Sequence, residues 1–178
     1  MSSASRYTPF AIALHWLMAL AILGSFSMGL YMADLPFSPQ RLKLFNWHKW
    51  AGVGILALSA LRLLWRLTHR PPSALPMPGW QAAAAQATHT LFYLAFFAVP
   101  LTGWAMSSAK GFPIVWFGVL PLPDFVPKDP ALGHVLEDLH SWLAWGLTVL
   151  VTAHVAGSLK HHFVDRDGLM GRMWPSRA

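Results

Sequence analysis

The sequence predicts an all-α integral membrane protein, a four-helix transmembrane bundle in a single domain that covers residues 1–178. Hydrophobic residues make up 55% of the chain and charged residues only 11%, whereas about a quarter of a typical soluble domain is charged. Four apolar stretches are long enough to cross a bilayer as a helix of about 20 residues, at residues 9–32, 45–67, 81–107 and 134–160. Tryptophans gather near the ends of these stretches, where their amphipathic rings are stable at the lipid headgroups: Trp47, Trp50, Trp65, Trp80, Trp104 and Trp142. The four spans leave no room for a separate soluble domain.

The first span is expected to stay in the protein, and the segments between the spans are expected to be connecting loops. Residues 9–32 are too long an apolar run for a cleaved signal peptide, whose hydrophobic region has about 7–15 residues, and Arg6 is the one basic residue before them. Residues 68–79 are rich in proline and predict an extended loop. Residues 110–133 also contain many prolines, and the apolar run 114–117 within them is expected to lie on the outer surface of the bundle.

The distribution of Lys and Arg predicts that both termini are cytoplasmic. Basic residues on the side of the termini are Arg6, Arg62, Arg66, Arg70, Lys160, Arg166, Arg172 and Arg177. The other side has Arg41, Lys43, Lys49, Lys110 and Lys128, and most of the acidic residues accompany them. Because cytoplasmic loops carry the excess of Lys and Arg, this pattern fixes the orientation. It also explains the net charge of +6 without a nucleic-acid partner, and membrane lipid is the partner that a basic inner surface predicts.

Two histidines in the last span, His140 and His154, predict a pair of metal centres. They are fourteen residues apart, so on one helix they share a face to within about 40° and are separated by about 21 Å along the axis. With both termini inside, His48 lies at the periplasmic depth of His140, and His15 at the cytoplasmic depth of His154. The depths therefore pair His48 with His140 and His15 with His154.

The chemistry of these pairs indicates haem iron. Glu137 and Asp138, the acidic residues of the fourth span, lie at its rim, whereas a metal transporter usually has carboxylates deep in the membrane. Two neutral imidazoles form a closed six-coordinate b-type centre suited to electron transfer. The chain has no cysteine, which excludes disulfides, iron–sulfur ligation and covalent haem attachment. Glycines along the first two spans (Gly24, Gly29, Gly52, Gly54) provide space for a flat macrocycle. The sequence thus predicts two haem b groups, and a histidine-based metal transporter is a minor alternative.

Four other residues are weighed for roles near these centres. His89 has about the same depth as His15 and His154, so a ligand, a contact to a haem propionate or quinone, and simple helix packing all stay open for it. Arg62 lies fourteen residues after His48 and either pairs with a haem propionate or extends to the inner interface. His161 lies at the cytoplasmic boundary and either delivers protons to quinone or is an interfacial residue of the basic tail. His134 points about 160° away from His154 and is excluded as a ligand.

Several stretches together resemble the bacterial cytochrome b561 family, which is related to the cytochrome b subunits of nickel–iron hydrogenases and formate dehydrogenases. They are Ile12–Trp16, Asn46–Lys49, Arg62–Arg66, His89–Gly103, Leu159–Phe163 and Arg172–Pro175. The resemblance covers essentially the whole chain. It implies a di-haem protein of the bacterial inner membrane, with ligands from the first, second and fourth helices. Lys49, directly after the outer ligand, departs from the neutral residue expected there and would alter the outer haem potential or attract an anion.

The expected function is electron transfer across the membrane from a periplasmic donor to ubiquinone or another quinone near the cytoplasmic side. By resemblance, superoxide is the leading donor, which would make the protein a superoxide:quinone oxidoreductase. The alternative is a membrane anchor and electron-relay cytochrome b subunit for a partner dehydrogenase, hydrogenase or soluble cytochrome. The short loops favour the first hypothesis because they offer little surface for a partner, and the sequence predicts no particular oligomeric state.

Overall fold

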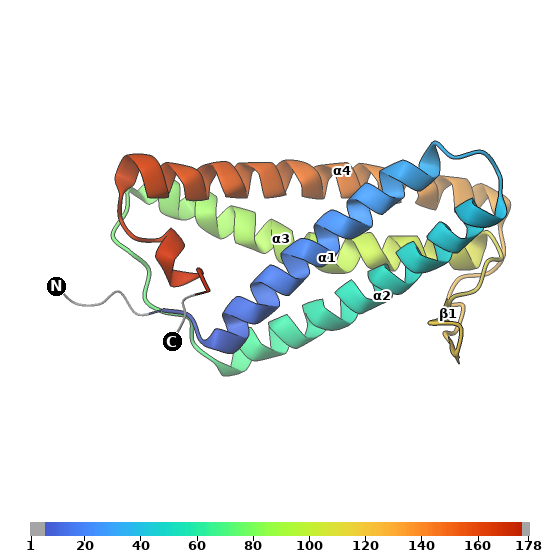
Figure 1. Cartoon of the computed structure of the whole chain (residues 1–178), viewed down its shortest axis with the longest axis horizontal. Helices are drawn as coiled ribbons and strands as arrows, with labels where there is room; N and C mark the ends of the chain where they lie inside the picture. The colour runs from blue at the N-terminus through green and yellow to red at the C-terminus, as the bar shows by residue number, and fades with distance from the viewer. Residues whose placement is uncertain (1–5, 176–178) are drawn as a thin grey trace.

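Four long helices form the protein in the computed structural model, which describes residues 6–175 (Figure 1). They are α1 (Pro9–Ala33), α2 (Pro39–Thr68), α3 (Gly79–Ala109) and α4 (Pro130–Lys160). Each helix includes one of the predicted spans and is long and apolar enough to cross a membrane. Arg177, one of the residues that predicted the orientation, lies outside the described residues.

The starts of α1, α2 and α4 share one local signal. A proline occupies the beginning of each helix, and the residue before it (Thr8, Ser38 or Asp129) accepts a hydrogen bond from a backbone N–H of the first turn. Proline fits here because the first turn has no acceptor for its N–H, and the capping oxygen satisfies a further donor. These caps explain why α2 and α4 begin before residues 45 and 134, where the predicted apolar spans begin.

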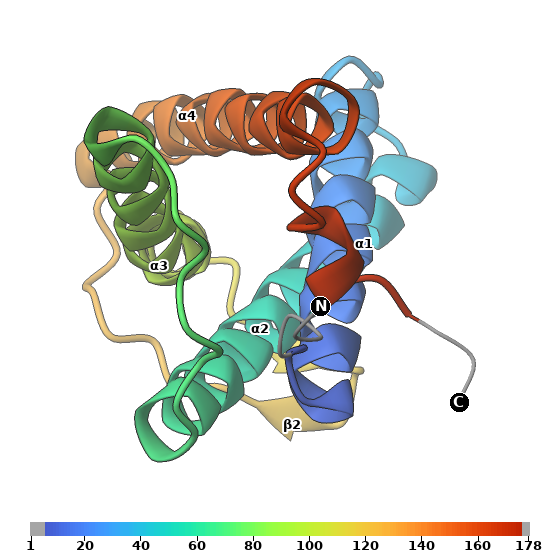
Figure 2. The same ribbon diagram turned by 90° about the vertical axis from the view of Figure 1, so that its left-hand side faces the viewer.

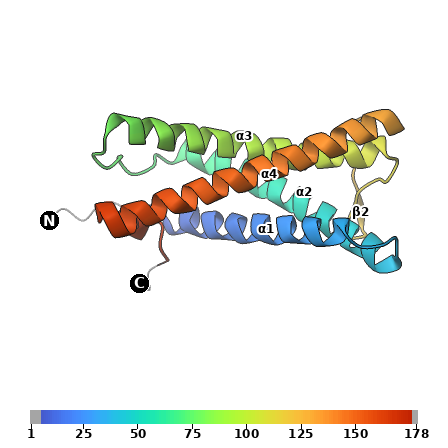
Figure 3. The ribbon, with the colours of Figure 1, turned by 90° about the horizontal axis from the view of Figure 1, so that it is seen from above.

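Seen end-on, the four helices form the four sides of the bundle, with α4 beside α3 and α1 beside α2 (Figure 2). The start of α1 and the end of α4 lie at one end of the bundle, called here the terminal end (Figure 3). The other end, the hairpin end, carries the loop from α1 to α2 and the long loop from α3 to α4. Many large apolar side chains are exposed along the helices, such as Leu20, Leu64 and Val149, as expected for helices that face lipid.

A proline inside α3 is accommodated by a neighbouring helix. Pro100 has no N–H to donate to the carbonyl of Phe96, one turn earlier. The hydroxyl of Ser59 on α2, which is fully buried, lies 3.4 Å from that carbonyl and 2.7 Å from the carbonyl of Ile55. Because a backbone oxygen has no water partner within a bilayer, this contact supports the break in the helical hydrogen bonding.

The loop from α3 to α4 contains a short β-hairpin that the sequence analysis did not predict. Strand β1 (Val115–Trp116) pairs antiparallel with β2 (Leu120–Pro121), with Trp116 opposite Leu120. Phe117 and Gly118 both have positive φ in the connecting turn, the conformation that matches the twist of a hairpin. A non-glycine residue such as Phe117 rarely has a positive φ. A turn at this position was therefore not expected, and residues 114–117 were predicted only to lie on the outer surface of the bundle.

The C-terminal tail folds back onto the terminal end. After α4 come a π-helical turn (His161–Asp165) and a 3₁₀ turn (Met170–Arg172). The indole of Trp16 on α1 donates to the carbonyl of Met173 at 2.8 Å, and the buried Arg172 donates to the carbonyl of Ser73 at 2.9 Å. These bonds connect the tail to α1 and to the loop before α3.

Candidate functional site

The structure brings His48 and His140 together near the hairpin end. Their ring centroids are 6.1 Å apart and the ring planes are at 89°. Nδ1 of His48 lies 3.1 Å from the carbonyl oxygen of Ser25, and Nδ1 of His140 lies 3.0 Å from that of Val99. Since a carbonyl can only accept, each Nδ1 is the protonated nitrogen and Nε2 keeps its free lone pair. This is the tautomer and orientation that metal-ligating histidines usually have.

Two glycines face these histidines at close range. A side chain at Gly29 would place its Cβ 3.3 Å from Cε1 of His48, and one at Gly103 would place its Cβ 3.0 Å from Cε1 of His140. Both distances are shorter than an ordinary van der Waals contact, so glycine at these positions lets the helix backbones approach the histidine rings. Gly24, Gly52 and Gly54 have open space around them.

A second pair, His15 and His154, lies toward the terminal end. The ring centroids are 6.2 Å apart, and the planes are at 54°. The guanidinium of Arg62 on α2 lies 3.5 Å from Nδ1 of His15, so this pair has a cation beside it. Both pairs use α4, and their partners come from α2 and α1 as the sequence analysis predicted; whether they bind iron stays a prediction.

The dimensions of both pairs suit a metal ion between two imidazoles. Each bonding nitrogen lies about 2 Å from such a metal and roughly 1.1 Å from its ring centroid, which places the centroids about 6.2 Å apart. α4 packs closely on α3 but makes few close backbone approaches to α1 and α2, the helices that carry the partner histidines. The rings therefore meet across a wide separation of the helices, which would leave room for a flat macrocycle held by the two histidines.

His89 on α3 also approaches the second pair. Its ring centroid is 5.9 Å from that of His154, so ring distance alone does not separate it from His15. Its side chain is more exposed than that of His15, however, and it projects from the helix that packs closely on α4. A close helix pair leaves little room for a macrocycle between its two backbones, so the arrangement favours His15.

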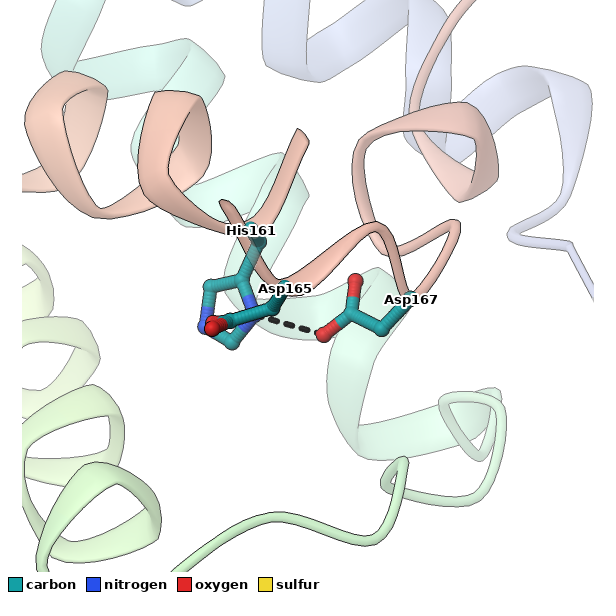
Figure 4. A group of neighbouring side chains, drawn as sticks. All are labelled: His161, Asp165 and Asp167. Atoms are coloured by element: carbon teal, nitrogen blue, oxygen red, sulfur yellow. Dashed lines mark hydrogen bonds and ion pairs between the residues drawn. The ribbon is translucent and has the colours of Figure 1, made fainter. Parts of the chain in front are cut away.

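His161 belongs to a group with two carboxylates at the start of the tail (Figure 4). Its Nδ1 lies 2.6 Å from a carboxylate oxygen of Asp167 and 3.2 Å from one of Asp165. Burial would raise the pKa of Asp167, but hydrogen bonds from the Leu169 amide and from His161 outweigh it, so the pKa lies below its ordinary value. The three side chains are close enough to hold a metal ion, but the Lys160 ammonium already lies 2.6 Å from Asp165. The two carboxylates are therefore already paired, Asp165 with Lys160 and Asp167 with His161.

Two lysines and a histidine at the hairpin end have roles outside the pairs. The ammonium of Lys49 donates to the carbonyl oxygens of Phe112 and Pro113 at 3.3 and 3.4 Å. The Lys49 side chain thus holds the long loop against α2. His134 is exposed and lies beside Glu137, which pairs with Lys110.

Sequence reasoning missed the carbonyls of Ser25 and Val99 as partners of the histidines, and the close approach of Gly103. A backbone carbonyl has no residue signature, so its role depends on which turn of a neighbouring helix faces the ring. Gly103 follows Pro100, and a glycine so near a helix-breaking proline is the one signal that could have indicated a close backbone contact.

Known proteins are similar to this chain over nearly its whole length. A family model described as prokaryotic cytochrome b561 matches residues 6–176, which include all four helices and the tail. The chain is a member of this family. Cytochrome b561 homolog 2 of Escherichia coli K12 is 36% identical over 172 residues, covering 94% of this chain and 90% of the relative. Cytochrome b561 homolog 1 of the same organism is 29% identical over 178 residues, covering 97% and 99%.

A third relative, the probable superoxide oxidase CybB of Yersinia pestis, is 28% identical over 174 residues, and the match covers 97% of each chain. Membership of the cytochrome b561 family makes this chain a multi-pass membrane cytochrome b that acts in electron transfer, and the family implies b-type haem. His48 and His140 with their free Nε2 positions, and the wide separation of α4 from α1 and α2, fit that group.

Proposed function

We propose that the protein holds two haem b groups and passes electrons through them across the bacterial inner membrane to a quinone. His48 and His140 would ligate the haem at the hairpin end, and His15 and His154 the haem at the terminal end. The observation that carries this proposal is that α4 presents two histidines, each about 6 Å from a histidine of another helix. Bound haem supplies one-electron redox chemistry at each pair.

The protein's own residues would orient and separate the two centres. The carbonyls of Ser25 and Val99 fix the imidazoles at the hairpin end. Arg62 would neutralise a propionate at the terminal end, because a half-buried guanidinium needs an anionic partner. His89 lies close enough to this centre to contact a propionate or the quinone.

Direction follows from the placement of charge. The excess of Lys and Arg at the terminal end supports a cytoplasmic position for both termini. The donor would then act from the periplasm at the hairpin end, and the quinone, ubiquinone or a related one, would be reduced near the cytoplasm. His161, held against Asp167 at this boundary, would supply a proton to the quinone.

The donor proposed is superoxide, on the similarity to the probable superoxide oxidase of Yersinia pestis. The test uses the purified protein in lipid nanodiscs, with superoxide generated enzymatically and a short-chain ubiquinone as acceptor. Reduced haem and quinol should both form, and superoxide dismutase should abolish both. If superoxide leaves the haem oxidised while a co-purifying dehydrogenase or soluble cytochrome reduces it, the protein is a relay subunit instead.

Gly103→Val is expected to weaken the haem at the hairpin end. The added side chain begins 3.0 Å from Cε1 of His140, and overpacking of this kind typically costs about 1–3 kcal/mol. The purified variant should retain less haem than the wild type, and the shortfall should be at one site. Gly146→Val is the matched control, because Gly146 is exposed on α4 and an added side chain there meets nothing within 4 Å. Equal haem loss in both variants would contradict the proposal that Gly103 makes room for the ring of His140.

His161→Gln is expected to slow quinone reduction several-fold while leaving haem content and haem reduction by dithionite unchanged. Glutamine keeps a hydrogen bond near Asp167 but cannot carry a proton at neutral pH. The rate of quinol formation should be measured from about pH 6 to about pH 9. His162→Gln, an exposed neighbour, is the control. A wild-type rate and pH profile in His161→Gln would remove this residue from proton delivery.

A further inference from the structure

The β-hairpin of the long loop has an unusual surface for a segment outside the helices. No charged residue occurs between positions 111 and 123. At its turn and second strand, Phe117 is 63% exposed, Val119 83% and Leu120 51%. Contiguous apolar surface of this kind marks contact with a membrane or a protein.

The hairpin lies beside α2 rather than beyond its end (Figure 1). The indole of Trp50 donates to the carbonyl of Val115 at 2.7 Å, and the indole of Trp116 donates to the carbonyl of Trp50 at 3.1 Å. Trp50 is five residues after Phe45, where the apolar stretch of α2 begins, which places it about 7.5 Å into that stretch. The hairpin is therefore attached at a depth where α2 is already one of the apolar, lipid-facing helices.

The side of the hairpin that faces the helices is apolar at Trp116 and Phe117 as well. Between it and the helices lies a cavity of about 470 Å³. Its lining includes Ala21 of α1, Trp47 and Gly54 of α2, and Trp116 and Phe117 of the hairpin, with no charged residue. The apolar surface thus continues without interruption from the lipid-facing side of α2 onto the hairpin.

The hairpin backbone can enter an apolar environment at little cost. The amides of Gly118, Val119 and Leu122 donate to carbonyls within the same loop at 2.8–3.1 Å. Pro113, Pro121 and Pro123 have no N–H that would need an acceptor. Few backbone donors are therefore left to lose water, which is the main barrier to placing non-helical chain in lipid.

We propose that the hairpin Val115–Pro121 inserts into the lipid leaflet at the hairpin end and is a membrane-contacting element of the bundle. Lipid is the partner because the exposed side chains continue a lipid-facing surface, and they carry no charge that would select a polar protein. Trp50 donates to the carbonyl of Val115, and Lys49 donates to the carbonyls of Phe112 and Pro113. These bonds attach the inserted loop to the helical turn that follows His48. The inference does not depend on the identity of the haem ligands.

The absence of cysteine from the chain allows a direct test with one label at a time. Val119→Cys carries an environment-sensitive NBD fluorophore in the full-length protein in phosphatidylcholine nanodiscs. Asp34→Cys, in the other loop at the same end and also exposed, is the matched control. The label at 119 should emit at shorter wavelength, be quenched at least two-fold by lipids spin-labelled on the acyl chain, and resist aqueous iodide. The label at 34 should show the reverse.

Leu120→Cys provides a second probe of the same surface, and the unchanged haem spectrum of each variant checks that it is folded. Quenching by iodide and not by spin-labelled lipid at both 119 and 120 would overturn the proposal. Protection from both quenchers would also overturn it, because a protein, such as a second copy of this chain, would then cover the hairpin.

Discussion

Replacing His48 with leucine is expected to remove one haem and leave the other, so that the haem-to-protein ratio of the purified protein falls by half. His140 alone would then have to hold the haem, and the other polar groups beside it, the Thr102 hydroxyl and the Val99 carbonyl, are poor haem ligands. His140→Leu should give the same product, since the two side chains would bind one iron. Haem extraction with protein quantitation measures the ratio, and a redox titration shows which centre has been lost.

His134→Leu is the matched control for this experiment. His134 lies on the same helix near the same end but is largely exposed beside Glu137, so its replacement should leave both haems in place. A full haem complement in His48→Leu would contradict the assignment. Loss of both haems from His48→Leu while His134→Leu keeps both would indicate that the two sites assemble as one unit.

Replacing His15 with leucine is expected to remove the haem at the terminal end, whereas His89→Leu should retain it. Both rings approach His154 at similar distances, 6.2 and 5.9 Å. The helices differ, however, because α3 packs closely on α4 and α1 does not. A macrocycle therefore has room between His15 and His154 but not between His89 and His154. Haem content and the low-spin signal of a six-coordinate iron in electron paramagnetic resonance spectra distinguish the variants.

His89→Leu carries its own expected effect. If His89 contacts a propionate or the quinone, the variant keeps two haems and shows a shifted potential of one haem or slower quinone reduction. If it only packs between helices, haem content, potential and rate are all unchanged. Loss of one haem in His89→Leu with two haems retained in His15→Leu would reverse the pairing.

The arrangement of the histidines could be predicted because two regular quantities determine it. The helical repeat places His140 and His154 on one face, and the membrane assigns each a depth that matches His48 or His15. Four apolar stretches likewise predicted four helices. Helix starts were less predictable from hydrophobicity, because the caps at Ser38 and Asp129 lie outside the apolar runs.

Features that depend on how helices face one another were beyond the sequence pattern. The carbonyls of Ser25 and Val99 orient the histidines only because particular turns of α1 and α3 face α2 and α4. The contacts of the Lys49 ammonium with loop carbonyls were not foreseen either, and its effect on the outer haem or on an anion stays a prediction. The hairpin was missed because its turn requires a positive φ at Phe117, which no residue type at that position signals.

The most direct test of two haems held by two histidine pairs is the haem stoichiometry of the purified wild-type protein. Pyridine haemochrome absorbance with amino-acid analysis should give two haem b per chain, and the reduced-minus-oxidised spectrum should contain a b-type α-band. A redox titration should resolve two one-electron transitions. One haem per chain, with a single transition, would contradict the proposal that both pairs ligate iron.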